Sequence, residues 1–196
     1  MPKHALIFQK HLVVYGASTL ARMKIASLFR IAKKDIPNYL ECIHYFNNQC
    51  SPYGYKLCIL SEDEISLLVY VYNARKLTNL LAEPAIKNFL SDYGYKQCQT
   101  SRALQHLQTR LHSNLDFPHE IGIFLGYPLQ DVQAFMCPCK KCLYIGHWKV
   151  YGNVNKSKKT FERFDCCRKT METRIAQGET LVQILKKCNE HTSHLS

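Results

Sequence analysis

The sequence predicts an α+β fold, in which several helices pack around a small antiparallel sheet. Two runs rich in β-branched and aromatic residues, 55–60 and 65–72, flank a short acidic segment and predict a hairpin. Both faces of its second strand are apolar, so both are expected to be covered. Residues 143–151 alternate in the manner of a strand. We therefore expect a sheet made of hairpin 55–72 plus strand 143–151.

Segments on both sides of the hairpin carry the apolar spacing of amphipathic helices. Helices are expected at residues 18–32, 36–46, 74–81, 85–93, 100–112, 128–136, 154–175 and 180–188, with a helical turn at 119–125. Residues 4–15 fit a helix or a strand, and Gly16 to Ser18 should interrupt them. Ser18 or Thr19 would cap the helix that follows. Gly94 and Gly178 are expected to end helices.

Length and composition predict one compact domain over residues 1–196, onto which the basic C-terminal helical segment 154–188 packs. The 196 residues are 46% apolar, which is enough for a buried core. Because no run of 18 apolar residues occurs, no membrane span is expected. Gln9, Lys10 and His11 break up the first apolar stretch, so it lacks the core of a signal peptide, which favours a cytoplasmic location.

The formal charge of +11 is concentrated in the two end regions of the chain. Residues 1–34 hold seven Lys and Arg and no acid, whereas residues 137–188 hold twelve Lys and Arg against four acids. If these regions meet, they form a positive face that would attract nucleic acid, an acidic protein or an anionic cofactor. The alternative is a solvated surface that keeps the protein in solution.

Ten cysteines point to thiol chemistry. In a reducing compartment, free thiols, metal ligation or redox chemistry are favoured over structural disulfides. Several cysteines should be plain core residues, and Cys42 and Cys58 fit that role best.

The cluster Cys137-Pro138-Cys139-Lys140-Lys141-Cys142 has spacings that let thiolates converge on a soft ion. Zn²⁺ or iron would suit these ligands. The candidate metal ligands are Cys137, Cys139, Cys142 and Cys167, with His147 and Cys98 as further donors and Cys166 as another source of the fourth ligand. The alternatives are a redox-active pair without metal, or a loop with incidental thiols.

His119 and Glu120 follow Pro118 at a predicted helix start. As a functional pair they would supply general-base chemistry or a ligand for iron or haem. The structural alternative has His119 bonded to nearby backbone and Glu120 capping the helix, and this alternative is favoured.

A nucleic-acid-binding surface is a further hypothesis, because aromatic and basic residues follow the cysteine cluster. Its basic residues are Lys149, Lys156, Lys158, Lys159, Arg163, Arg168 and Lys169. The aromatic residues on the strand, such as Trp148, would equally suit a core. The chain has no phosphate-binding glycine motif, which excludes nucleotide binding by those routes.

Several blocks of sequence resemble an uncharacterised bacterial family. They are STLARMKIASLF (18–29), LVYVYNARKL (68–77), FLSDYGY (89–95), HEIGIFLGYPLQDVQAF (119–135) and GHWKVYG (146–152). This order resembles the domain-of-unknown-function family 3793, for which HEIGIFLGYP is specific. The resemblance implies no established activity. It associates the chain with anaerobes, flavodoxins and ferrous-iron uptake, and hence with iron or electron-transfer physiology.

The chain departs from the family pattern at positions 15 and 16. Members typically carry a His-Cys pair just before the first helix, and this chain has Tyr15 and Gly16 there. A cysteine at a helix N-terminus would have a lowered pKa and could act as nucleophile or ligand. Its absence argues against a Cys-His hydrolase.

The leading hypothesis is therefore a cytoplasmic protein that binds a metal or redox cofactor through clustered cysteines, with a redox protein as partner. The alternative is a module that binds nucleic acid or an acidic protein. A third hypothesis is an enzyme that uses His119 and Glu120, which would require a pocket lined by both.

Overall fold

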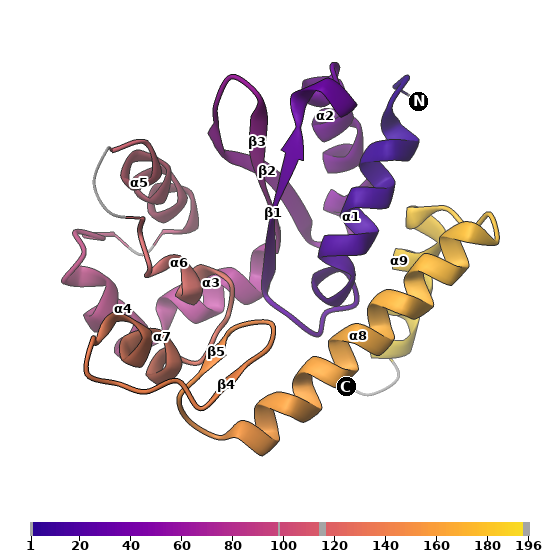
Figure 1. Cartoon of the computed structure of the whole chain (residues 1–196). Helices are drawn as coiled ribbons and strands as arrows, with labels where there is room; N and C mark the ends of the chain where they lie inside the picture. Colours follow the sequence, from indigo (N-terminus) through magenta and orange to yellow (C-terminus); the bar gives the residue numbers. More distant parts are fainter. Residues whose placement is uncertain (1, 98, 114–116, 194–196) are drawn as a thin grey trace. The chain divides into compact units, whose positions relative to one another are not determined.

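The computed structural model describes residues 2–97, 99–113 and 117–193, with side chains described up to residue 188 (Figure 1). Its helices and small antiparallel sheets confirm the α+β class. The chain forms two compact units, Met1–Arg75 with Cys166–Ser196, and Lys76–Asp165. A single domain over 1–196 stays a prediction. Within the described residues, no helix combines the length and apolar character needed to cross a membrane.

The first unit is built on a three-stranded antiparallel sheet in the order β1-β3-β2. Its strands are β1 (Ala26–Ala32), β2 (Tyr55–Glu62) and β3 (Ser66–Asn73). The predicted hairpin is confirmed, with Leu57 opposite Val71 and a register shift between Ile59 and Ser61. Every residue of β3 is buried, as its apolar residues on both faces predict.

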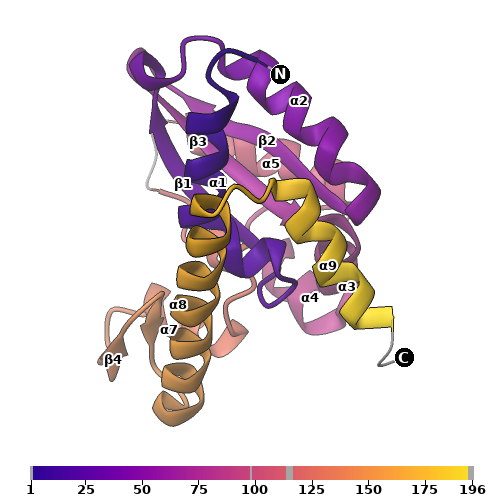
Figure 2. The same ribbon diagram turned by 90° about the vertical axis from the view of Figure 1, so that its right-hand side faces the viewer.

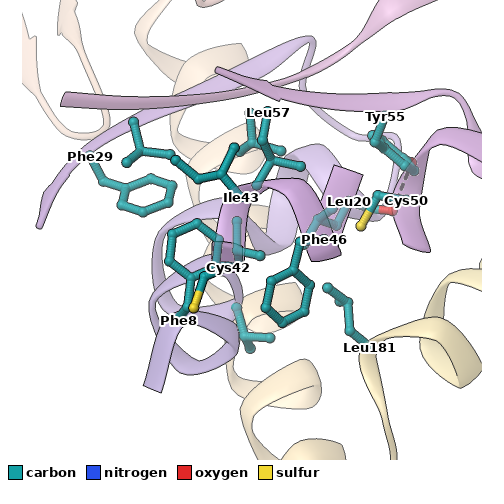
Figure 3. Packing of buried hydrophobic residues seen from close by; sticks show 14 of the residues in the cluster. Phe8, Leu20, Phe29, Cys42, Ile43, Phe46, Cys50, Tyr55, Leu57 and Leu181 are labelled. Carbon is teal, nitrogen blue, oxygen red and sulfur yellow. Dashed lines mark hydrogen bonds between the residues drawn. The ribbon is translucent and has the colours of Figure 1, made fainter. Parts of the chain in front are cut away.

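Helices α1 (Ala5–Leu20) and α2 (Tyr39–Cys50) pack on one face of this sheet (Figures 1 and 2). The Phe8 and Phe46 rings stack with centroids 5.4 Å apart, one from each helix. Figure 3 shows these two rings in the core beneath Phe29 and Leu57 of the strands. Each such buried side chain contributes about 1.5–3 kcal/mol through the hydrophobic effect. This core holds the first unit together.

Two C-terminal segments complete the first unit. They are the second half of α8 (Val154–Ala176) and α9 (Leu181–Ser193), which are joined through Gly178 in a left-handed conformation. Met171 from α8 and Leu181 from α9 belong to the same core as α1 and α2, and α9 packs against α2 (Figure 2). The helices predicted at 154–175 and 180–188 are confirmed.

The helix predicted at residues 18–32 is wrong. Helix α1 runs through Gly16 to Leu20, and residues 26–32 are strand β1. Arg22 ends α1 in a left-handed conformation (φ 59°), with its amide bonded to the Thr19 carbonyl and the Met23 amide to the Ser18 carbonyl. Glycine usually takes this position, so the sequence gives no stop signal there. Thr19 is buried and bonds Ser27 at 2.8 Å, so it does not cap a helix.

The second unit is mainly helical. It contains most of α3 (Ala74–Ala82), then α4 (Pro84–Ser91), α5 (Thr100–His112), α6 (Ile121–Phe124), α7 (Leu129–Met136) and the first half of α8. The bounds of these helices agree with the predicted bounds to within a few residues. Pro84 begins α4, and Gly94 follows its end in a left-handed conformation, as expected.

Residues 143–151 do not join the three-stranded sheet, which corrects the prediction. They form their own ribbon in the second unit, with β4 (Tyr144–Ile145) paired antiparallel to β5 (Lys149–Val150). Gly146 lies in the connection, where a methyl group would meet the Phe161 ring at 2.2 Å. The alternating pattern predicted one strand, but it belongs to a short hairpin that packs against Phe161 of α8.

Candidate functional site

The side chains that could bind a ligand or react lie in the second unit, within residues 117–152. Helix α6 and strand β5 both pack on α7. The short elements bring side chains from distant parts of this segment together. Three features result: a buried carboxylate cluster, a pocket walled by aromatic rings, and a turn carrying two thiols.

The buried carboxylate is Glu120. Its side chain is 0% exposed, and it accepts hydrogen bonds from the Arg110 guanidinium and, at 3.0 Å, from the Tyr95 hydroxyl. Burial and the neighbouring Glu120 carboxylate hold the pKa of Tyr95 above its ordinary value, so the phenol stays protonated and donates. The three groups satisfy one another inside the unit, which is how a buried charge is tolerated.

The predicted cap at the start of α6 is wrong. The Glu120 side chain makes no cap hydrogen bond and turns to Arg110 instead. His119 is exposed, and its ring packs edge-on against Phe135 with centroids 4.9 Å apart. The enzyme that uses His119 and Glu120 stays a prediction. Of the two residues, only His119 is among those that line the pocket described below.

Asp131 fixes the ribbon β4–β5 to α7. One of its oxygens accepts from Trp148 Nε1 at 2.9 Å, and the other accepts from the amides of Tyr151 and Gly152 at 2.9 and 3.0 Å. The side chain is almost fully buried. From the sequence, Asp131 is recognisable only as an acid in the first turn of α7, where it suits the helix dipole, and its role as an acceptor for the ribbon is not. Its spacing from Trp148 carried no local signal.

The pocket has a volume of about 310 Å³ and lies between α6, α7 and β5. Tyr127 stacks on Trp148 with ring centroids 5.0 Å apart, and Ile121 and Val132 form the buried wall. A methyl group on Gly122 would come within 2.8 Å of Val132, so a glycine keeps this wall open. Most of the lining is apolar or aromatic, which is typical of small-molecule sites.

The thiol turn follows α7 directly. The Lys140 amide bonds the Cys137 carbonyl at 3.1 Å, and Pro138 occupies the second position of this turn, which its fixed φ favours. The turn brings the sulfurs of Cys137 and Cys139 to 2.7 Å. A hydrogen bond from the Cys139 thiol and the charge of Lys140 lower the pKa of Cys137, whereas the same contact raises that of Cys139.

The other predicted ligands lie elsewhere. The Cys142 thiol points at the carbonyl oxygens of Tyr144 and Val150, at 3.2 and 3.7 Å. Cys167 belongs to the first unit, where burial raises its pKa to about 11. His147 lies 3.3 Å from Asp165.

Three or more metal-binding side chains do not gather anywhere in the described part of the chain. Cys98 falls outside that part. The metal site on Cys137, Cys139, Cys142 and Cys167 stays a prediction.

Three cysteines of the first unit agree with a core role, whereas Cys166 is exposed. Cys42 is fully buried in the first unit, as expected, and Cys50 beside it is likewise buried. Cys58 is half-buried, and burial raises its pKa to about 12. Such thiols stay protonated at neutral pH and are poor nucleophiles.

The predicted basic surface lies largely along α8. Most of its residues are exposed, namely Lys149, Lys156, Lys158, Lys159, Arg163 and Lys169, whereas Arg168 is half-buried and pairs with Glu172. Lys158 Nζ sits 4.8 Å above the Tyr144 ring. Binding of nucleic acid or an acidic protein through this surface stays a prediction.

Position 16 does not lie at a helix N-terminus. Gly16 is buried inside α1, and a side-chain carbon there would meet Val71 at 3.3 Å. A cysteine at this position would therefore face β3 in the core of the first unit, where burial raises a thiol pKa. A cysteine at position 16 would therefore not be activated by a helix dipole in this fold.

The fold and site define a small α+β protein in which helix α7 lines an aromatic pocket and is followed directly by the thiol turn. The chain belongs to the family described as protein of unknown function DUF3793, whose model matches residues 12–185. This confirms the resemblance drawn from the sequence blocks. No curated protein and no solved structure gives a significant match.

Proposed function

We propose that Cys137 and Cys139 form a dithiol that exchanges with disulfides. The observation that carries the proposal is the 2.7 Å between their sulfurs. Two thiolates on one tetrahedral zinc ion would lie about 3.8 Å apart, given zinc–sulfur bonds of about 2.3 Å. The observed contact lies between a disulfide bond of about 2.0 Å and that zinc-bound spacing, so the turn holds the two sulfurs close enough to form a disulfide and too close for two separate zinc ligands.

The two cysteines have different roles in the exchange. The Cys137 thiolate attacks a sulfur of a small-molecule or partner-protein disulfide, which forms a mixed disulfide and releases one thiolate. Cys139 then loses its proton and attacks the Cys137 sulfur, which closes the Cys137–Cys139 disulfide and releases the second thiolate. The protein gives up two electrons and two protons, and the partner disulfide takes them up. This chemistry would fit the predicted redox partner and the link to electron transfer.

Equilibration with reduced and oxidised glutathione without oxygen tests the proposal. Trypsin releases residues 111–140 as a peptide whose only cysteines are Cys137 and Cys139. As the buffer becomes more oxidising, the Cys137–Cys139 disulfide should form before any other. Its formation is detected as the loss of two hydrogen atoms from this peptide. Cys137→Ser should abolish the loss, and the matched variant Cys142→Ser should retain it.

Two outcomes would overturn the dithiol. One is a peptide 111–140 that keeps both thiols free while other cysteines oxidise. The other is stoichiometric zinc or iron in protein purified without oxygen, lost in Cys142→Ser, which would support the predicted metal site instead.

Alkylation by iodoacetamide should show the asymmetry of the pair. Because the pKa of Cys137 is lowered, its reactive thiolate persists to a lower pH than that of an ordinary cysteine. Cys139→Ala removes the hydrogen bond, so the midpoint of the pH dependence should move upward. Cys167, with a pKa raised to about 11, is the slow internal reference. Equal alkylation profiles for Cys137 and Cys167 would contradict the assignment.

A further inference from the structure

We propose that the aromatic pocket of the second unit binds a small aromatic carboxylate. The pocket is a separate feature from the dithiol, and the proposal does not depend on thiol exchange. Its evidence is the shape and rigidity of the cavity, the nature of its walls, and the distribution of charge around it.

The walls are fixed before any ligand arrives. Asp131 holds Trp148 through the indole N–H, and Tyr127 stacks on the indole and donates to the His147 carbonyl at 3.3 Å. Ile121 and Val132, both buried, complete the lining. A cavity held in this way costs little conformational entropy when it is filled. It is therefore a preformed binding site.

The size and walls indicate an aromatic ligand of about two rings. A volume of about 310 Å³ is at the lower end of the range of roughly 300–1,000 Å³ seen for small-molecule pockets. Stacked and edge-on aromatic pairs are favourable. Flat rings of a ligand can therefore pack against Trp148 and Tyr127 inside the pocket. At its rim they can pack against Phe117 and Phe135. A dinucleotide would not fit such a cavity.

The positive charge of Lys149 at the rim of the pocket favours a ligand that carries a negatively charged group. Lys149 is exposed, places its ammonium 4.9 Å above the Phe135 ring, and makes no ion pair with a described acidic residue. His119 lies against the same ring. The one acid in the lining, Asp131, has both oxygens engaged by N–H donors of the protein, which offset its charge. A carboxylate on the ligand would pair with Lys149 while the rings enter the cavity.

Trp148 provides the measurement, since it is the only tryptophan of the chain and lines the pocket. The protein would be titrated with 4-biphenylacetate, its neutral amide, and the cationic 4-biphenylmethylamine, while tryptophan fluorescence is recorded. We expect a saturable change with the carboxylate, weaker binding of the amide, and the weakest binding of the amine. Cys137→Ser should bind the carboxylate as the unmodified protein does, which separates this test from that of the dithiol.

Variants of Lys149 decide the role of charge. Lys149→Met should weaken carboxylate binding by about two- to fivefold, the contribution of a partly exposed ion pair, and leave the amide unchanged. Lys149→Arg should restore the preference, and Lys158→Met, an exposed lysine outside the pocket, should have no effect. Absence of a saturable change with all three probes would overturn the site. Tighter binding of the amine than of the carboxylate would overturn the ligand class.

Discussion

Glu120→Ala is expected to destabilise the second unit by about 3–5 kcal/mol, because it leaves a cation and a hydroxyl without their buried acceptor. The carboxylate is fully buried and accepts from both Arg110 and Tyr95. Arg110 is partly exposed and can turn toward water, which places the expected loss near the lower value. Urea unfolding followed by circular dichroism and Trp148 fluorescence would measure the free energy.

The matched control for this change is Glu120→Gln. The amide keeps the shape and can still accept from Tyr95, so it should cost clearly less than alanine. Arg110→Met alone should also destabilise, and adding it to Glu120→Ala should cost less than the sum of the two changes, because the residues form one network. Fully additive losses would contradict the buried pair.

Asp131→Ala is expected to cost a similar amount, about 3–5 kcal/mol, because three N–H donors lose their charged acceptor at once. Those donors are Trp148 Nε1 and the amides of Tyr151 and Gly152. Without them the β4–β5 ribbon is no longer fixed to α7. Trp148 should become more exposed to water, with red-shifted emission that is more readily quenched by iodide.

Asp131→Asn separates the hydrogen bonds from the charge. Its amide oxygen can still accept from the two backbone amides, whereas its N–H₂ group would face the indole N–H. An intermediate loss of stability with a partly exposed Trp148 is therefore expected. Asp92→Ala, an exposed acid in the same unit, should leave both readouts unchanged. An unchanged Trp148 emission spectrum in Asp131→Ala would show that the Asp131 hydrogen bonds do not position the indole.

Much of the fold follows from the sequence alone. The hairpin of β2 and β3 was predictable because two β-rich runs flank a short polar segment, and α5 was predicted with its actual bounds because its apolar spacing is regular. The cysteine cluster was identified from its spacing, and Pro138 favours the turn that brings the thiols of Cys137 and Cys139 together. These features depend on contacts within a few residues along the chain.

Other features were decided only by tertiary structure. Residues 26–32 have apolar positions that fit a helix, but pairing with the edge of β3 makes them a strand, and Arg22 ends α1 without the usual glycine. The partner of Asp131 is Trp148, seventeen residues away, and that of Glu120 is Arg110 on another helix. Local sequence fixes conformational preference and periodicity. The choice among partners distant in the chain depends on how the packed elements bring buried polar groups together, since a buried charge must find its donors wherever the fold supplies them.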